Sequence, residues 1–203
     1  MTDTLPYFLA DFTDANGTYE KASLWLHDGV SSSTHPFRLL TVATIGVDDL
    51  PNARLVVLRN FVQSTRTLEF HTDVRSPKVA QLRRNPHVCL LFYDPVVRFQ
   101  LRIAATAQLY NNDDIARHTW RTMRETSQSI YSVGVGPGGL VKGNVPAEKP
   151  SFQAENEAAA LGNFVVVRCE FHEMDLLELH PSGHRRALLQ WVVGCPVIQR
   201  IAP

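Results

Sequence analysis

The sequence predicts a mainly β protein with peripheral helices, its antiparallel sheet most economically closed as a barrel. Apolar and polar residues alternate with a period of two over much of the chain after residue 36. The strand-like segments follow one another with few helical segments between them, which is typical of antiparallel sheets. No internal repeat is visible, and 203 residues lie within the range of one domain, so we expect a single domain over residues 1–203.

Seven segments carry the strand pattern, and a short eighth strand is expected at 196–203. The seven lie at residues 37–46, 53–61, 67–72, 87–93, 96–110, 163–180 and 185–193. The segment 87–93 is apolar on both faces, which predicts a strand buried on both sides. The polar row Arg98, Gln100 and Arg102 lies opposite an apolar row of the same strand. The strands 163–180 and 185–193 are separated by "PSG" and should form a hairpin.

Helices are expected at four places. They cover the opening 26 residues, 77–84, 112–128 and, with a weaker pattern, 154–161. The segment 112–128 begins with an Asn/Asp cap and an acidic first turn, and 77–84 is closed by Asn85-Pro86. A Ser-rich loop is expected at 27–36, and a long Gly- and Pro-rich loop at 133–150.

Composition and charge exclude several classes of function. Lys and Arg total 20 and so do Asp and Glu, so no broad basic face for nucleic acid is expected. The N-terminus lacks a signal-peptide pattern, and the longest apolar run is too short to span a membrane and contains Pro196. The three cysteines are far apart, which favours free thiols in a reducing compartment. We therefore expect a cytoplasmic protein with no membrane contact.

The start of the 77–84 helix gathers hydroxyls and cations. Ser76 suits the N-cap position, and Pro77 suits the first helical position. Lys78 in the first turn and Arg75 just before it both oppose the positive end of the helix dipole. This unfavourable choice is explained if an anion binds there, and phosphate is the usual anion at a helix N-terminus. The alternative is a solvated, capped helix with surface cations.

Two neighbouring segments add candidate residues. Arg54 and Arg59 are five residues apart and lie on opposite faces of a regular strand, so the strand must bulge or end near Arg59 if both reach one ligand. Gln100 stands between two arginines, and its amide can both donate to and accept from the edge of a heterocycle. The alternatives are an ordinary strand with arginines at its ends and a solvent-facing polar row.

Two other patterns are excluded by the residues around them. "GVGPGG" at 134–139 matches a dinucleotide-binding pattern, but the glycine and prolines after it prevent a helix. His180 and His184 lie across a Pro-Gly turn with no carboxylate at a fixed spacing, so no metal site is expected. No nucleophile motif and no specific proton-transfer signature is present, so the catalytic residues stay unknown.

Four motifs in order resemble one family. They are "RLVVLR" at 54–59, "FHTDVRSPK" at 70–78, "NPHVCLLFY" at 85–93 and "RFQLR" at 98–102. Their order and spacing resemble those of the pyridoxamine 5'-phosphate oxidase-like FMN-binding split barrels, continuously over about residues 37–110 and loosely over 162–203. The resemblance implies an antiparallel FMN-binding split β-barrel that forms a homodimer, with FMN at the subunit interface.

The resemblance also implies which residues bind FMN. The phosphate and ribityl chain would be held by Arg54, Thr72, Arg75, Ser76 and Lys78. The segment Val57, Leu58 and Arg59 would run along the flavin ring, and Gln100 would meet its polar edge from across the interface. Arg186 matches the C-terminal flavin-contacting arginine of the family, and His71 and Arg102 complete the expected set.

The departures from the oxidase concern its substrate. Pro77 stands where the oxidase has arginine, and Thr119 and Met123 stand where it has a tyrosine and an arginine that grip the substrate phosphate. Ser127-Gln128 is kept, while Leu179 replaces a flavin-flanking tryptophan. The chain thus resembles the branch of related FMN-binding proteins with no assigned substrate. We expect an FMN-dependent oxidoreductase acting on a small molecule; the alternatives are the authentic oxidase, a non-catalytic FMN-binding protein, or a barrel that binds no flavin.

Overall fold

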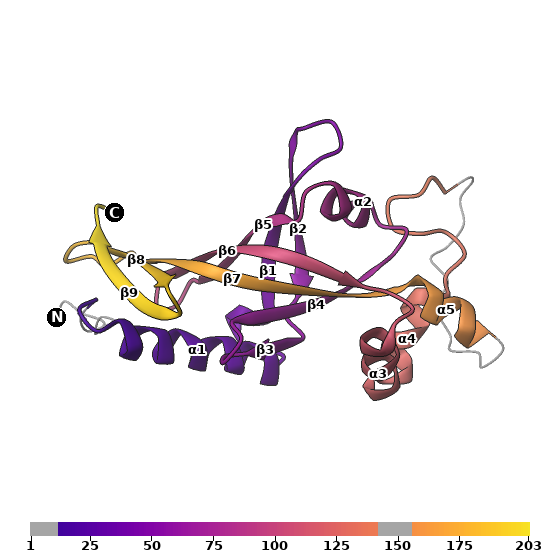
Figure 1. The fold of residues 1–203 in the computed structure, drawn as a ribbon, viewed down its shortest axis with the longest axis horizontal. Coiled ribbons are helices and arrows are strands. Elements are labelled where there is room, and N and C mark those ends of the chain that lie inside the picture. Colours follow the sequence, from indigo (N-terminus) through magenta and orange to yellow (C-terminus); the bar gives the residue numbers. More distant parts are fainter. Residues whose placement is uncertain (1–11, 142–155) are drawn as a thin grey trace.

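The computed structural model describes residues 12–141 and 156–203, and their strands form one antiparallel sheet of nine strands (Figure 1). The strands are β1 Leu39–Ile45, β2 Pro51–Val57, β3 Asn60–Val62, β4 Thr67–Asp73, β5 His87–Asp94, β6 Phe99–Tyr110, β7 Phe164–Glu178, β8 Arg185–Val192 and β9 Cys195–Ile201. The α-helices are α1 Ala15–Ser31, α2 Pro77–Arg84, α3 Asp114–Thr122, α4 Glu125–Gln128 and α5 Glu157–Asn163, with 3-10 turns at Pro36–Arg38 and Ser129–Ser132.

The sheet curls round because one chain segment joins its two edges. The strand order is β2-β1-β5-β6-β7-β4-β3, and β8 and β9 extend the sheet from β7. Leu58 N–H donates to Arg38 O at 2.9 Å, continuing the pairing of β2 with β1, whereas Arg59 N–H donates to Glu69 O at 2.8 Å and begins the pairing with β4. The corner at Leu58–Arg59 therefore passes from one edge of the sheet to the other, which confirms the predicted barrel-like antiparallel architecture.

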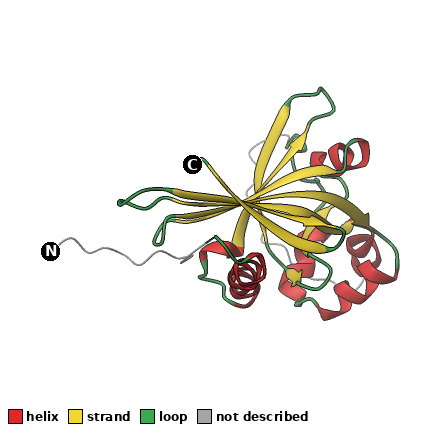
Figure 2. Ribbon diagram, turned by 60° about the vertical axis from the view of Figure 1, so that its left-hand side comes forward, coloured by secondary structure: helices red, strands yellow, loops and turns green. Residues whose placement is uncertain are grey.

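Alternating side chains of these strands fill the interior. Leu40, Val42, Leu90, Leu101 and Ile103 are each at most 1% exposed. Burying such side chains contributes roughly 25 cal/mol for each Å² of apolar surface removed from water, which makes this the main stabilising term of the fold. Figure 2 shows the strands twisted across one another, with the helices placed at the sides of the sheet.

The helices cover two separate parts of the sheet. α1 runs along one side and packs Ala22 and Leu26 into the main core. Helices α3 to α5 lie at the other end, where Trp120 of α3 packs with Phe164 and Val166 of β7 in a second apolar cluster. The cavity described below lies between the C-terminal end of α1 and the α3–α4 junction.

Most of the predicted elements are confirmed, with shifted boundaries. The predicted strand 53–61 is two strands separated by the corner, so the chain meets the condition set for Arg54 and Arg59 to reach one ligand, a strand that bulges or ends near Arg59. The predicted helix 112–128 is broken between α3 and α4, and Asp113 caps α3 by accepting from Ala116 N–H at 2.8 Å. The predicted helix 154–161 begins at Glu157, and its first two residues lie outside the described part, as do residues 1–11 of the opening helix and 142–150 of the predicted loop.

Three local predictions are wrong. Residues 27–31 are helical rather than loop, because Gly29 lets α1 pack closely against the Phe37 carbonyl, which a Cβ would approach to 2.7 Å. β5 is buried on one face only, since Cys89 is partly exposed and Tyr93 is 45% exposed. Arg98 has φ 54° in the turn before β6, so it does not continue the polar row of that strand.

No helix in the described residues is long and apolar enough to cross a membrane. The prediction of a single domain over residues 1–203 stays a prediction.

Candidate functional site

The N-terminus of α2 holds a cluster of hydroxyls around one lysine. Thr72 lies on β4, and the turn after β4 leads into α2. As predicted, Ser76 is at the N-cap position and Pro77 is at the first helical position. Ser76 makes no capping bond with its side chain, however. Its Oγ instead accepts from Lys78 Nζ at 2.7 Å, and Thr72 Oγ1 accepts from the same ammonium at 3.0 Å.

Arg54 reaches the same end of α2 from β2. Its Nη1 donates to Thr44 Oγ1 at 2.6 Å, and its Nη2 donates to Gln81 Oε1 at 2.8 Å. Gln81 Oε1 also accepts from the Thr44 hydroxyl at 2.7 Å, so β1, β2 and α2 are joined by one buried polar network. The sequence reasoning missed Gln81, although its place one turn after Lys78 puts it on the same helix.

We refer to Arg54, Thr72, Ser76 and Lys78 as the cradle. Neither cation of the cradle forms an ion pair with a carboxylate of the described chain. Burial lowers the pKa of Lys78, the charge of Arg54 lowers it further, and Asp73 opposes both. Burial also lowers the pKa of Arg54. The cradle thus holds two cations that repel each other beside two hydroxyls, and an anion would relieve that repulsion.

Arg75, the fifth residue predicted to hold the phosphate, faces a different partner. Its Nε and Nη2 bind the two carboxylate oxygens of Asp73 at 2.9 and 2.7 Å. Its Nη1 donates to the carbonyls of Val133 and Gly134 at 2.9 and 3.2 Å. Hydrogen bonding to Asp73 raises the pKa of Arg75, so this charge is already neutralised within the chain. The structure does not bring Arg75 into the cradle, and its role toward phosphate stays a prediction.

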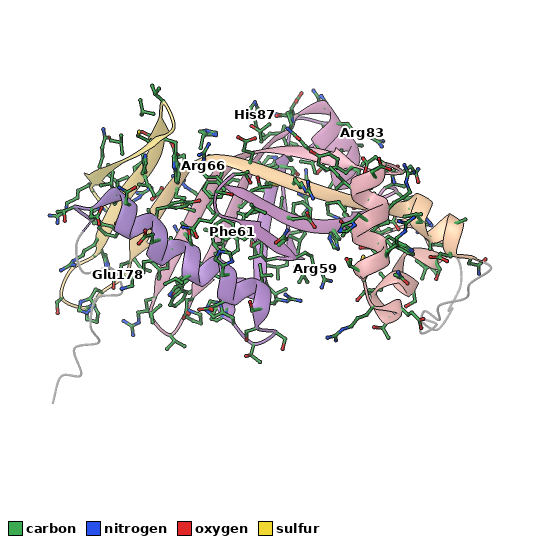
Figure 3. The ribbon with its side chains drawn as sticks, turned by 60° about the horizontal axis from the view of Figure 1, so that its bottom comes forward. Arg59, Phe61, Arg66, Arg83, His87 and Glu178 are labelled. Atoms are coloured by element: carbon green, nitrogen blue, oxygen red, sulfur yellow. The ribbon has the colours of Figure 1, made fainter. Side chains whose placement is uncertain are left out.

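A second concentration of positive charge lines a cavity of about 490 Å³. Arg38, Arg59 and Arg124 contribute to its wall, together with His71 and Ser127; Figure 3 shows Arg59 between α1 and α3. We call it the arginine cavity. Its lining residues are Val30, Ser31, Ser33, Arg38, Arg59, His71, Met123, Arg124 and Ser127.

No carboxylate is among the described residues that line the arginine cavity. Arg38 is held in place by the carbonyls of Val30 at 2.7 Å and Leu58 at 3.2 Å, which satisfy only one of its nitrogens. Burial lowers the pKa of Arg59, and the charge of Arg38 lowers it further, against an opposite effect of Tyr131. The sequence reasoning missed Arg38 and Arg124, because neither lies in a recognisable motif.

An ion-pair network around the buried Glu69 carboxylate adjoins His71, one of the residues that line the arginine cavity. His71 Nε2 is 3.1 Å from Glu69 Oε1, and Arg168 Nε donates to Glu69 Oε2 at 3.0 Å. Burial raises the pKa of the Glu69 carboxyl, but the bonds from His71 and Arg168 outweigh it and lower that pKa overall. These three residues belong to β4 and β7, whose register places Glu69 opposite Arg168.

The remaining predicted cofactor residues lie elsewhere on the sheet. Val57 ends β2 and is half-buried, while the Leu58 side chain is 1% exposed in the core, so only its backbone is available near the corner. Gln100 is half-buried on β6. Arg102 and Arg186 both bind the carboxylate of Asp175, at 2.5 Å and at 2.7 and 2.9 Å. Within one chain eight of the twelve predicted residues therefore form three groups, at the cradle, at the arginine cavity and around Asp175, and Arg75, Val57, Leu58 and Gln100 belong to none of them.

Two further predictions concern metals and thiols. In the described residues, no group of three or more His, Cys, Asp or Glu side chains is placed to hold a metal ion. The three cysteines are free, as predicted, and burial raises the pKa of the Cys169 thiol to about 12.

Comparison with known proteins identifies relatives. The family described as pyridoxamine 5'-phosphate oxidase, FMN-binding domain, matches residues 22–111. A pyridoxine/pyridoxamine 5'-phosphate oxidase of Bradyrhizobium diazoefficiens is 31% identical over 109 residues, 51% of this chain and 50% of the relative. The corresponding oxidase of Gloeothece citriformis is 24% identical over 208 residues, 97% of this chain and 95% of the relative. In the Bradyrhizobium and Azorhizobium caulinodans oxidases, the match spans only about half of the relative, 50% and 45%.

Two solved structures share the fold over nearly the whole chain. A pyridoxamine 5'-phosphate oxidase-related, FMN binding protein from Nostoc punctiforme has a TM-score of 0.70 at 23% identity, covering 96% of this chain and 99% of that one. PhzG from Burkholderia lata, solved in complex with tetrahydrophenazine-1-carboxylic acid, has a TM-score of 0.73 at 16% identity, covering 98% and 100%. At these identities the likeness shows a common fold.

Proposed function

Because residues 22–111 match the family described as pyridoxamine 5'-phosphate oxidase, FMN-binding domain, we propose that this chain is an FMN-dependent oxidoreductase whose cradle holds the cofactor phosphate. The observation that carries the proposal is the pair of cations, Arg54 and Lys78, that lie at the start of α2 with no carboxylate partner in the described chain. In the first helical turn Pro77 has no N–H and the Val79 N–H already donates to Ser76 O at 2.9 Å, so this turn would add at most the Lys78 N–H to their donors. FMN, when bound, supplies hydride chemistry, and the protein supplies position and electrostatics.

The arginine cavity is proposed to hold the anionic part of a small-molecule substrate. Three guanidinium groups with no carboxylate among the described lining residues favour an anion, and guanidinium groups bind carboxylate or phosphate oxygens. Arg59 belongs to the corner segment that follows β2, the strand that carries Arg54, so one short segment connects the cavity with the cradle. The cavity is therefore the proposed place for a substrate beside the flavin.

A homodimer is proposed from the outer face of β1, β2 and β5. Their register aligns Leu39 with Val57 and Thr41 with both Leu55 and Leu91. Leu39 and Leu55 are 50% and 65% exposed, and Tyr93 adds a further exposed ring. A contiguous apolar face of this kind is typical of a protein–protein interface. Gln100 and Arg102 of β6 lie next to it, so a second copy bound there would face this predicted polar row.

The visible spectrum of the purified protein, with and without added FMN, tests the cofactor. We expect a bound-flavin spectrum that is lost in a Lys78→Ala/Arg54→Ala double variant. A colourless protein whose melting temperature does not rise with FMN would instead indicate a barrel that binds no flavin. Flavin that binds but is not reduced by any donor would indicate a non-catalytic binding protein. Turnover of pyridoxamine 5'-phosphate with release of peroxide would identify the authentic oxidase.

Sedimentation of the wild type and of a Leu55→Glu variant tests the dimer. We expect a dimer that dissociates in the variant, because a charge on this face opposes burial. A wild-type monomer at micromolar concentration, or a dimer unaffected by the charge, would contradict this interface.

A further inference from the structure

The side chain of Gln81 joins α2 to the arginine of the cradle. It is 6% exposed and lies one turn after Lys78, on the helix that packs beside β1 (Figure 1). Its Oε1 accepts from Arg54 Nη2 at 2.8 Å and from the Thr44 hydroxyl at 2.7 Å. Thr44 Oγ1 in turn accepts from Arg54 Nη1 at 2.6 Å. The three side chains therefore form one closed set of hydrogen bonds, which we call the Gln81 network.

The chemistry of the groups fixes the direction of each bond in the Gln81 network. A guanidinium group only donates, so the oxygen and not the nitrogen of the Gln81 amide faces Arg54. The Thr44 hydroxyl donates its one proton to that oxygen, while its lone pair accepts from Arg54. Turning the amide round would place its NH2 group against the guanidinium and leave buried donors unpaired, which costs free energy. The network thus holds the guanidinium group in one orientation.

The Gln81 network leaves one edge of the Arg54 guanidinium free. Nη1 donates to Thr44 Oγ1 and, at 3.2 Å, to the carbonyl of Val42, and these bonds use both of its hydrogens. Because Thr44 Oγ1 and Gln81 Oε1 are bonded to each other, they lie on the edge between Nη1 and Nη2. The bonds within the described chain therefore leave Nε–H and the second hydrogen of Nη2, which point in the same direction. Such a pair binds two oxygens of one phosphate group.

The acceptors that hold Arg54 are neutral, in contrast to those of two other arginines. Hydrogen bonds to Asp73 and Asp175 raise the pKa of Arg75 and of Arg186, whereas burial lowers the pKa of Arg54. The amide oxygen of Gln81 thus fixes the guanidinium without supplying a negative charge. A carboxylate in its place could accept the same bond, but it would offset the charge that an anion needs.

We propose that Gln81 is a positioning residue for the cofactor phosphate: together with Thr44 it fixes Arg54 so that the edge formed by Nε and Nη2 stays free and fully charged for two phosphate oxygens. Gln81 acts through Arg54 and does not itself touch the phosphate. This inference rests on the proposed function, because it takes the phosphate of FMN as the anion of the cradle.

The substitution Gln81→Glu separates this role from a merely structural one. It keeps the size of the side chain and an oxygen for Arg54, and it adds a negative charge. We expect FMN affinity, measured by fluorescence titration, to fall at least about tenfold, because a carboxylate beside Arg54 offsets the charge that binds phosphate. The melting temperature of the FMN-free protein should be kept or rise, since the new carboxylate pairs with the guanidinium. A structural role alone would lower affinity and melting temperature together.

Ala80→Glu is the matched control, because Ala80 is exposed on the same helix. It adds the same charge to the solvent-exposed surface of α2, so FMN affinity should change by less than about threefold. Equal losses of affinity in the two variants would show that only the general charge of α2 matters. That result, or an unchanged affinity in Gln81→Glu, would overturn the proposal.

A double-mutant cycle shows whether Gln81 acts through Arg54. Gln81→Met removes the acceptor without adding charge, and FMN affinity should fall about three- to tenfold, as expected for the loss of one hydrogen bond. In an Arg54→Met background the same change should have no further effect, because the group that Gln81 orients is absent. Additive losses, or no loss when Arg54 is present, would contradict the positioning role. The cycle also decides the question if Gln81→Glu does not fold.

The FMN proposal is judged separately, from the binding of FMN to the wild type. If FMN does not bind, inorganic phosphate replaces it in calorimetric titrations of the same variants. A phosphate site that is weakened in Gln81→Glu and kept in Ala80→Glu would support the positioning role while the FMN proposal fails. If phosphate does not bind either, or binds Gln81→Glu as it binds the wild type, both proposals fail.

Discussion

The cradle and the outer face of β6, β7 and β8 differ in whether a carboxylate neutralises their positive charge. On that face, Asp175 is 2% exposed and neutralises both Arg102 and Arg186. At the cradle, the partners of Arg54 and Lys78 within the described part of the chain are hydroxyl, amide and carbonyl groups. A count of arginines near a motif therefore does not measure the capacity to bind an anion. The informative quantity is the positive charge that no carboxylate of the chain offsets.

Replacing Asp175 with asparagine should have the largest effect. The change leaves two arginines without their shared partner, and we expect the free energy of unfolding to fall by about 2 kcal/mol. This is below the 3–5 kcal/mol of a fully buried pair, because the Arg102 and Arg186 side chains are 48% and 28% exposed. Urea denaturation measures the loss. The matched control is Asp114→Asn, whose exposed pair with Arg117 should leave stability unchanged.

The pH dependence of that loss gives a stricter test. Burial raises the pKa of the Asp175 carboxyl, but the bonds and charges of Arg186 and Arg102 lower it overall. Because the folded-state pKa lies below the unfolded value of about 3.9, the stabilisation is complete above that pH and is lost as the pH falls through the folded-state pKa. The difference between wild type and Asp175→Asn should be constant near neutrality and vanish in acid. A difference that peaks in acid would show that the carboxylate is not the stabilising group.

At the cradle, Lys78→Met should weaken FMN binding about 10- to 100-fold. The estimate follows from roughly 1.5–3 kcal/mol for hydrogen bonds to a charged group. Fluorescence titration of FMN measures the affinity. Arg83→Met is the matched control, since Arg83 is an exposed cation on the same helix (Figure 3). Equal losses in the two variants would mean that only the general charge of α2 matters.

Alkaline pH should reproduce part of the Lys78→Met effect. Burial and the nearby Arg54 lower the pKa of Lys78, so in the free protein the ammonium loses its proton below the ordinary 10.5. FMN affinity should therefore fall as the pH rises through that lowered pKa, by at most about tenfold per pH unit for one coupled proton. Lys78→Met should show no such fall over the same range. An identical pH profile in both proteins would assign the proton to another group.

The fold was largely predictable from the sequence, because period-two alternation fixes which residues face the core. Residues 99–107 of β6 show this, since buried and less buried side chains alternate there, and 77–84 matches α2 at both ends; in β4, by contrast, Glu69 on the polar face is also buried. The sequence predicted the corner at Leu58–Arg59 only conditionally. The strand had to bulge or end near Arg59 if Arg54 and Arg59 were to reach one ligand. The helix through 27–31 was missed, because its Ser-rich sequence resembles a loop, whereas tertiary packing of Gly29 against Phe37 favours a helix.

The candidate site was less predictable than the fold. Thr72, Ser76, Lys78 and Arg54 do come together, since three of them lie within one strand–turn–helix segment. The arginine cavity depends on Arg38 and Arg124, which are 86 positions apart in the numbering and line one cavity only because the fold brings the 3-10 turn at Pro36–Arg38 near the α3–α4 junction. Likewise, the pairing of Arg75 with Asp73 depends on side-chain rotamers, and the pairing of Arg102 and Arg186 with Asp175 depends on strand register. No sequence motif encodes either of them.

The smallest expected effect concerns Asp73, the group that separates Arg75 from the cradle. Asp73→Asn removes a 5% exposed carboxylate that accepts from three nitrogens of Arg75, its backbone N–H, Nε and Nη2, and that lies near Lys78. We expect FMN affinity to rise a few-fold, because one negative charge beside the phosphate is gone and the Arg75 guanidinium is released toward it. The melting temperature without FMN should fall, since the bond that holds Arg75 is weakened.

Adding Arg75→Ala to Asp73→Asn decides between the two causes. If the gain in affinity disappears, Arg75 acts on the phosphate as predicted; if it persists, removal of the carboxylate is sufficient. A loss of affinity in Asp73→Asn would show instead that the Asp73–Arg75 pair shapes the cradle.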